Sequence, residues 1–231
     1  MKSKKILKNI YIDANLSLNE KVFLSSEVSE RLKKVMRFKK GWEFAVFNAR
    51  DGLFLAEILD SNCSEVLLKK QLKEQSKKTY KTLFLPILKK EALSNAIRQS
   101  TELGIDIIQP IITDFTVENS FKHQRYEQIV LGACEQSERL TIPEIEPVLS
   151  LQEAIDNFEN NIFWACERSD FALENMRFSA NDAVLIGPEG GFSEPEKEYL
   201  SLKENVIKSS LGDSILKADT AVVVAITKFM I

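Results

Sequence analysis

The chain has 231 residues, of which 44% are hydrophobic and 28% charged, and its formal net charge is −3. These values are typical of a globular protein, and no apolar run is long enough to span a bilayer. The lysines near the start are followed by no apolar segment, so we expect neither a signal peptide nor a membrane partner. Three widely spaced cysteines and one histidine argue against a disulfide framework and a His-rich metal site. We therefore expect reduced thiols, no metal and a cytoplasmic location.

The charge is divided unevenly along the chain. Residues 1–80 carry 17 Lys and Arg against 10 Asp and Glu, whereas residues 81–231 carry 14 against 24. This division indicates a nucleic-acid-binding first part joined to an acidic part with another task. Lysines that only solvate a small β domain would give the same balance, so charge alone leaves both interpretations open.

The first part of the sequence predicts a small β-barrel with one inserted helix. Strands are expected at residues 10–12, 21–24, 43–47, 53–59 and 65–72, with a turn over 48–52. A helix over 27–37 would carry an apolar face made of Val28, Leu32, Val35 and Met36. The polar segment 73–81 has no periodicity, so we predict domains at 1–72 and 82–231 joined by this linker. In the strand at 43–47 and just before it, alternation favours core packing over base stacking for Trp42, Phe44 and Phe47.

The second part alternates strands and helices, which predicts an α/β fold with a parallel sheet covered on both faces. Strands are expected at 83–88, 105–112, 162–166, 183–186 and 206–210. Helices are expected at 90–103, 123–138, 171–178, 194–202 and 219–229. Ligands in such sheets bind beyond the carboxyl ends of the strands. Three of these strand ends carry residues that could bind a ligand, at 166–168, 187–191 and 211–212.

Residues 185–196, LIGPEGGFSEPE, form the most informative segment. An apolar strand runs into a glycine-rich turn, and Ser193 with Glu196 has the spacing of a capping box at the start of a helix. Glycines let backbone groups approach a ligand closely. A phosphate would be attracted by such a turn but repelled by Glu189, so the turn suits a neutral or cationic ligand better.

This segment, followed by SLGDSILKADTA at 210–221, resembles the signature of the small-subunit ribosomal RNA uracil-N3 methyltransferases of the SPOUT superfamily. Further similar segments lie at 31–37, 56–58, 99–104, 133–137 and 143–145, with Pro110 and Arg139, so the resemblance covers nearly the whole chain. It implies S-adenosylmethionine-dependent methylation of N3 of a specific uridine in 16S ribosomal RNA. It also implies a PUA-like barrel, a SPOUT domain with a trefoil knot, a homodimer, and the RNA or the assembled small subunit as partner.

The resemblance and the residue types together imply a set of site residues. The expected cofactor pocket consists of Cys166, Glu167, Ile186, Gly187, Pro188, Glu189, Gly190, Gly191, Ser210, Leu211, Gly212, Ile215 and Leu216. The candidate catalytic residues, which would manage the uridine proton or charge, are Lys217, Asp219 and Glu189. The expected RNA-binding residues are Lys4, Lys5, Lys8, Arg31, Lys33, Lys34, Arg37, Lys39 and Lys40. Purely structural roles stay open: core filling for Ile215 and Leu216, helix-start stabilisation for Asp219, and solvation for the lysines.

Where the family commonly carries arginine, this chain has Phe115, Ser214 and Lys217. Arginine makes bidentate phosphate contacts that lysine cannot make. A second hypothesis is therefore a SPOUT protein with another RNA target or reduced activity. A nucleotide-dependent oxidoreductase ranks far lower, because the chain lacks G-x-G-x-x-G and has Glu189 in the turn. A non-enzymatic RNA-binding module would leave the glycine turns unexplained.

Overall fold

A computed structural model describes residues 5–75, 77, 79–116, 120–166 and 178–230. The chain forms two compact units, one comprising residues 1–77 and 134–142, the other 78–133 and 143–231. The first unit is therefore discontinuous in the sequence, which the linear pattern of strands and helices did not indicate. The domain boundaries at 1–72 and 82–231 and the linker at 73–81 stay predictions. In the described ranges, no helix is long and apolar enough to cross a membrane.

The first unit is built around a five-stranded sheet in the order β1-β3-β4-β5-β2. β1 pairs with β3 in parallel, and the other neighbours pair antiparallel. All five predicted strands are present, although β1 begins earlier than expected. The strands are β1 (Lys5–Tyr11), β2 (Lys21–Phe23), β3 (Glu43–Asn48), β4 (Gly52–Ile58) and β5 (Glu65–Lys73).

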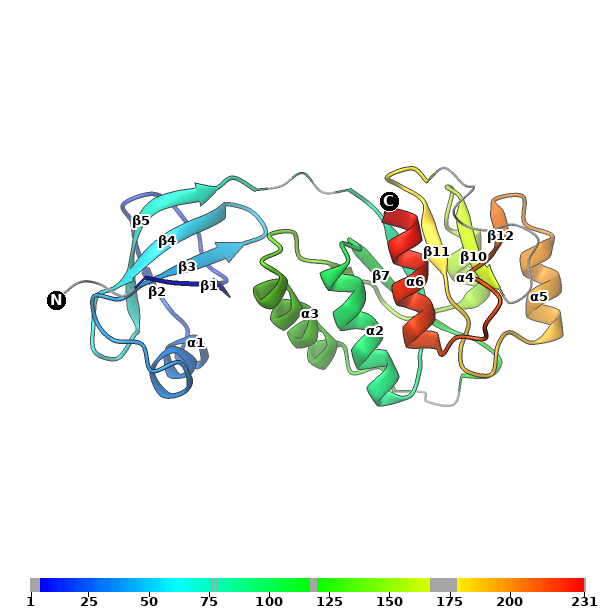
Figure 1. Ribbon diagram of the computed structural model, residues 1–231, viewed down its shortest axis with the longest axis horizontal. Coiled ribbons are helices and arrows are strands. Elements are labelled where there is room, and N and C mark those ends of the chain that lie inside the picture. Colours follow the sequence, from blue (N-terminus) through cyan, green and yellow to red (C-terminus); the bar gives the residue numbers. More distant parts are fainter. Residues whose placement is uncertain (1–4, 76, 78, 117–119, 167–177, 231) are drawn as a thin grey trace. The chain divides into compact units, whose positions relative to one another are not determined.

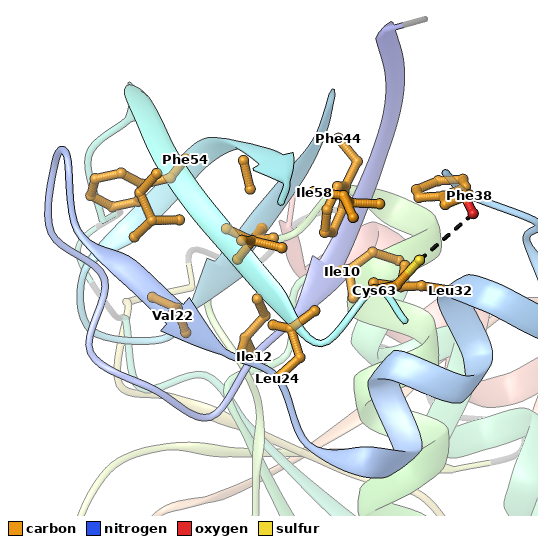
Figure 2. Packing of buried hydrophobic residues seen from close by; sticks show 14 of the residues in the cluster. Ile10, Ile12, Val22, Leu24, Leu32, Phe38, Phe44, Phe54, Ile58 and Cys63 are labelled. Atoms are coloured by element: carbon orange, nitrogen blue, oxygen red, sulfur yellow. Dashed lines mark hydrogen bonds between the residues drawn. The ribbon is translucent and has the colours of Figure 1, made fainter. Parts of the chain in front are cut away.

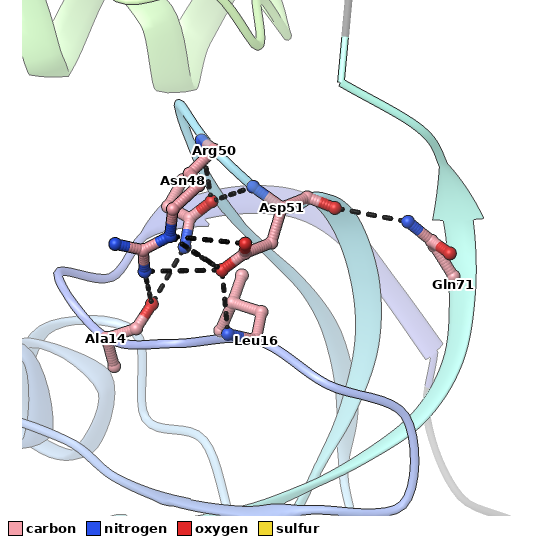
Figure 3. Close-up of polar contacts among 6 residues, drawn as sticks. All are labelled: Ala14, Leu16, Asn48, Arg50, Asp51 and Gln71. Atoms are coloured by element: carbon pink, nitrogen blue, oxygen red, sulfur yellow. Dashed lines mark hydrogen bonds and ion pairs between the residues drawn. The ribbon is translucent and has the colours of Figure 1, made fainter.

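Side-chain hydrogen bonds fix the turn between β3 and β4 (Figure 3). Asn48 Oδ1 accepts the backbone N–H groups of Arg50 and Asp51 at 3.0 and 2.6 Å. The Asp51 carboxylate accepts the Leu16 N–H group at 2.9 Å and the Asn48 amide at 2.8 Å. Gly52 takes a φ of +94°, and a Cβ there would overlap a backbone carbonyl oxygen of β5. The predicted turn is confirmed, since Asn48 pairs with Gly52.

The helical segment after β2 is not one regular helix. α1 (Ser26–Glu30) is α-helical, whereas the next turn, η1 (Arg31–Val35), is π-helical, with the Met36 N–H group donating to the Arg31 carbonyl oxygen at 3.0 Å. The wider turn changes the direction of the side chains that follow it. Leu32 is fully buried, as predicted, but Val35 is 75% exposed. Its predicted place on the apolar face is therefore wrong.

Apolar side chains from the sheet and from η1 form the core of the first unit (Figure 2). Phe44 and Ile58 on the sheet and Leu32 on η1 are fully buried. Trp42 packs against this cluster, and Phe47 is fully buried as well. The predicted core packing of these aromatic residues is confirmed, and their burial drives the folding of the unit.

The second unit is built around a parallel sheet in the order β12-β10-β11-β6-β7-β8, with β9 also paired to β7. Every pairing in it is parallel. The predicted parallel sheet is confirmed. Its strands are β6 (Thr82–Pro86), β7 (Ile107–Ile112), β8 (Glu144–Ile145), β9 (Leu149–Ser150), β10 (Ile162–Cys166), β11 (Ala183–Leu185) and β12 (Val206–Ser210).

Side chains alternate between the two faces along each strand, so both faces of this sheet carry apolar side chains. Helices cover both faces. Phe84, Trp164 and Leu185 share one buried cluster with Ala154 of α4 and Leu200 of α5, so these helices cover the same face. On the opposite face, α2 packs against α6, and α6 contacts β11. The helices are α2 (Lys90–Glu102), α4 (Leu151–Asp156), α5 (Glu194–Ser201), α6 (Ala218–Met230) and α3 (His123–Ser137), of which residues 134–137 belong to the first unit.

Three short elements, β8, β9 and α4, were not predicted. The start of α4 nevertheless has a sequence signal, because Ser150 and Glu153 form a capping box. β8 and β9 have two residues each, and they exist only because β7 offers them a partner. Of the predicted helix at 171–178, residues 171–177 lie outside the described part of the chain.

Candidate functional site

The carboxyl ends of three adjacent strands form the candidate site. β10 lies between β12 and β11, and the pairings are parallel, so all three strands end at one edge of the sheet (Figure 1). The segments that follow these strands line a cleft of about 1140 Å³. This is the edge where parallel sheets bind their ligands.

The turn after β11 is the first wall of the cleft. The Gly191 N–H group donates to the Pro188 carbonyl oxygen at 2.9 Å, which closes the turn. Gly191 has a φ of +71°, a conformation that costs L-residues with side chains free energy. No atom lies within 4 Å of the position that a Cβ on Gly191 would take. The backbone is therefore open to a ligand at this point.

α5 begins directly after this turn, with the predicted capping box. The Glu196 N–H group donates to Ser193 Oγ at 3.3 Å, and the Ser193 N–H group donates to Glu196 Oε2 at 2.8 Å. The loop after β7 joins the same helix start, because Ser193 Oγ donates to Asp114 Oδ2 at 2.5 Å. The Asp114 N–H group donates to Glu196 Oε1 at 2.9 Å. Two side chains thus tie the loop after β7 to the helix that carries the glycine turn.

Packed aromatic rings support the base of the turn. A Cβ on Gly187 would lie 3.2 Å from the ring of Phe192, which leaves little space for a side chain. Phe192 is buried and meets Trp164 edge to face, with ring centroids 5.8 Å apart. Such ring pairs stabilise a fold by more than the burial of their apolar area alone. A side chain at position 187 would therefore require the Phe192 ring to move by a few tenths of an ångström.

The segment after β12 is the second wall of the cleft. Ser210 Oγ accepts the Gly212 N–H group at 3.2 Å and donates to the Gly212 carbonyl oxygen at 3.3 Å. Gly212 has a φ of +137°, with no atom within 4 Å of a Cβ position. Ile215 is 71% exposed, so core filling does not explain it. Leu216, also in the lining, is half-buried.

The structure brings together most of the predicted pocket residues. Ser210 does not itself line the cleft, although it holds the Gly212 turn that does. Glu167 lies outside the described residues. The predicted residues that line the cleft are Cys166, Ile186, Gly187, Pro188, Glu189, Gly190, Gly191, Leu211, Gly212, Ile215 and Leu216.

Two of the three catalytic candidates line the cleft. Glu189 and Lys217 are exposed there, and Glu189 Oε1 accepts the Lys89 N–H group at 3.4 Å. Asp219 lies in the first turn of α6, beside the cleft-lining Ala218, and its Oδ1 atom accepts the Thr220 N–H group at 3.0 Å. Among the residues that the structure describes, no group of three His, Cys, Asp or Glu side chains is arranged to hold a metal.

Sequence reasoning missed one side of the cleft. Trp164 and Lys208 face each other on β10 and β12, and Lys208 Nζ lies 5.5 Å from the centroid of the Trp164 ring. Their pairing depends on the strand order, which the sequence pattern does not give. The other unpredicted lining residues are Ala165, Phe192, Glu194, Lys197, Glu198, Ser201, Ser214, Ala218 and Ala221.

The predicted RNA-binding residues have different surroundings in the first unit. Arg31 pairs with Glu135 at 2.7 Å, and the same Glu135 oxygen accepts the Tyr11 N–H group at 3.0 Å. Lys33 donates to Asn62 at 2.8 Å, and Lys34 pairs with Glu30 at 3.0 Å. Lys4 and the side chain of Lys5 lie outside the described part. The remaining predicted residues are exposed, namely Lys8, Arg37, Lys39 and Lys40.

Comparisons with known proteins place this fold among methyltransferases. A family model described as an RNA methyltransferase domain matches residues 75–230. The ribosomal RNA small subunit methyltransferase E of Rickettsia conorii is 37% identical, over 95% of this chain and 93% of its own length. The structure of the protein with the same name from Neisseria gonorrhoeae, bound to S-adenosyl methionine, is 25% identical with a TM-score of 0.83 and covers 96% of both chains.

A methyltransferase structure from Legionella pneumophila has the same fold, with 24% identity, a TM-score of 0.83 and coverage of 97% of both chains. The small sheet followed by a parallel sheet agrees with the predicted PUA-like and SPOUT arrangement, and the predicted α/β fold class is confirmed. The trefoil knot stays a prediction. The family model and the Rickettsia relative both cover most of the chain, which therefore belongs to the ribosomal RNA small subunit methyltransferase E family.

Proposed function

We propose that this protein transfers a methyl group from S-adenosylmethionine to N3 of a specific uridine in small-subunit ribosomal RNA. The observation that carries the proposal is the cleft beyond β10, β11 and β12. Its lining includes the glycine turns at Gly191 and Gly212 and the exposed carboxylate of Glu189. The Rickettsia relative is named a ribosomal RNA small subunit methyltransferase, and the Neisseria structure holds S-adenosyl methionine. The uridine N3 position rests on the family resemblance.

The residues of the cleft fit this cofactor. Open space at the Cβ positions of Gly191 and Gly212 leaves backbone groups available to adenosine. The Glu189 carboxylate favours a positive sulfonium and disfavours a phosphate. Exposed Ile215 supplies an apolar surface for the adenine ring. When bound, the cofactor supplies an electrophilic methyl group, and we propose that the predicted pocket residues hold it with that group inside the cleft.

The catalytic groups have to manage the proton on uridine N3, which leaves before or during methyl transfer. Glu189 and Lys217 line the cleft, so we propose that Glu189 accepts or relays the proton and that Lys217 stabilises the uridinate. Asp219 is the third candidate. Its hydrogen bond to Thr220 in the first turn of α6 fits a role in starting that helix equally well.

RNA capture is proposed for the basic residues of the first unit. Lys8, Arg37, Lys39 and Lys40 are exposed, and Lys33 and Lys34 are exposed beside single polar or acidic partners. Neutralising phosphates with such groups gives an affinity that falls with salt. Arg31 instead has its guanidinium bonded to Glu135, so its proposed contribution to RNA affinity is smaller.

The substrate, assembly and location of the protein also stay proposals. We propose that the partner is the small-subunit RNA or the assembled subunit, that the protein is a homodimer, and that it acts in the cytoplasm. Sedimentation at several protein concentrations tests the homodimer, and a monomer at all of them would overturn it.

A second candidate is methylation of another RNA. It is favoured by Phe115 and Ser214, which stand where the family commonly has arginine and therefore cannot make bidentate phosphate contacts. The oxidoreductase alternative is not retained, because the family consists of RNA methyltransferases.

Two experiments test the proposed function. Calorimetry with S-adenosylmethionine and, separately, with NAD should give binding of the first alone. Small subunits from cells that lack the modification should then accept tritiated methyl groups, and mapping should place the label on a uridine N3 position. Label on a different RNA would support the second candidate, methylation of another RNA. Binding of NAD in the cleft would overturn both proposed methyltransferase functions.

A further inference from the structure

Residues 113–116, the first part of the loop after β7, are attached to the wall of the cleft. Asp114 is bonded to Ser193 through its carboxylate and to Glu196 through its backbone N–H group. Within the loop, the Thr113 N–H group donates to Thr116 Oγ1 at 2.9 Å, and the two hydroxyl oxygens are 3.0 Å apart. These hydrogen bonds therefore hold residues 113–116 beside the glycine turn.

Phe115 is a partly exposed aromatic residue of this loop, and it lies beside the glycine turn. Its Cβ lies 3.4 Å from the position that a Cβ on Gly190 would occupy, so it packs on the glycine turn. Gly190 itself lines the cleft. Phe115 nevertheless remains 49% exposed, whereas Phe44 and Phe47 are fully buried. One side of this aromatic residue is supported by the protein, and the rest is open to solvent next to the cleft.

We propose that Phe115 is a stacking surface for the base of the target nucleotide, or for its immediate neighbour, as the RNA enters the cleft. This inference rests on the proposed function, which makes RNA the substrate. Unpaired bases stack on aromatic side chains when proteins bind single-stranded RNA. The hydrogen bonds of Asp114 hold the backbone beside Phe115, so little conformational entropy of the backbone is lost when a base stacks on the ring.

Substitution of Phe115 tests the inference. Truncating an aromatic stacking partner weakens binding by about 5- to 100-fold. Phe115→Ala should therefore raise KM for the small subunit, and the dissociation constant of a short uridine-containing RNA, by about that factor. Phe115→Tyr keeps the aromatic face and should restore both values. The affinity for S-adenosylmethionine should be the same in all these variants.

Tyr80→Ala is the matched control, because Tyr80 is an aromatic residue of the second unit that is 59% exposed and does not line the cleft. It should bind RNA as the wild type does. Wild-type affinity for RNA in Phe115→Ala, measured by fluorescence anisotropy without turnover, would overturn the stacking role. Equal losses of RNA and cofactor affinity would also overturn it, since they would assign Phe115 to packing of the turn. Absence of methyl transfer by the wild type would instead overturn the proposed function.

Discussion

Ser193 donates its hydroxyl hydrogen to the carboxylate of Asp114, 79 positions away in the sequence, over an Oγ–Oδ2 distance of 2.5 Å. The same hydroxyl oxygen caps α5 by accepting the Glu196 N–H group. One small side chain therefore stabilises a helix start and holds the loop after β7 against it. Since the glycine turn leads directly into this helix, the cap is connected to the cleft that we propose holds the cofactor.

Replacing Ser193 by alanine should lower both stability and cofactor affinity. Loss of an N-cap costs about 1 kcal/mol, and Asp114 also loses its side-chain partner. Urea unfolding and calorimetry with S-adenosylmethionine measure the two effects. Ser150→Ala removes the equivalent cap of α4, which lies outside the cleft lining, and should reduce stability alone. Equal cofactor affinities for both variants would contradict this connection.

Gly191→Val should abolish cofactor binding in calorimetry. The new side chain would occupy the open space at the turn, and the left-handed backbone would add strain of about 1–2 kcal/mol. Gly41 has a φ of +81° and also has no atom near its Cβ position, but it belongs to the first unit. Gly41→Val should therefore be strained to a similar extent and still bind the cofactor. Retained affinity in Gly191→Val would refute the proposed pocket.

Lys217→Ala should slow methyl transfer by about 100-fold or more, the usual size of acid–base and charge-stabilising effects. Cofactor affinity should change little, because the lysine is proposed to act on the uridine. Lys197→Ala is the control, since Lys197 also lines the cleft but pairs with Glu194 at 2.7 Å. Single-turnover rates on small subunits compare them. An unchanged rate in Lys217→Ala removes this residue from the mechanism.

Replacing Lys33 and Lys34 by glutamate should weaken RNA binding and reduce the dependence of the affinity on salt. Both residues lie on η1 of the first unit. The control is the same replacement of Lys70 and Lys73, exposed residues of β5 in the same unit, which changes the net charge equally. If the two double variants bind alike at every salt concentration, only the total charge matters and the proposed RNA surface is wrong.

Asp51 should make stability depend on pH. Partial burial would raise the pKa of this carboxyl, but hydrogen bonds from Asn48, Leu16 and Arg50 outweigh it and hold the pKa below the ordinary value of 3.8. A lowered folded-state pKa gives stability that is present above the unfolded pKa and is lost as the pH falls through the folded one.

Asp51→Asn should therefore cost roughly 1.5–3 kcal/mol at neutral pH, the usual contribution of hydrogen bonds to charged groups. The difference from the wild type should shrink as the pH falls below 3.8. Urea unfolding between pH 7 and 3 measures it, with the exposed Asp13→Asn variant as control. A difference that stays constant with pH would show that the charge of Asp51 contributes nothing.

Local chemistry explains why much of the fold and site could be predicted. The capping box at Ser193 and the turn at Asn48 depend on residues within a few positions, and both were predicted correctly. Val35 was misplaced because the pattern assumed 3.6 residues per turn, whereas η1 is π-helical. Trp164 and Lys208 were missed because β10 and β12 are neighbours only in the folded sheet.

Glu135 has a consequence for the order in which this chain can fold during translation. Its carboxylate accepts both Arg31 and the Tyr11 N–H group, and residues 134–142 complete the first unit. The ribosome must therefore release the chain as far as residue 142 before the small sheet has all its partners. A fragment that ends near residue 81 would expose Arg31 without its counter-ion, so it should be less stable than the same unit within the full chain.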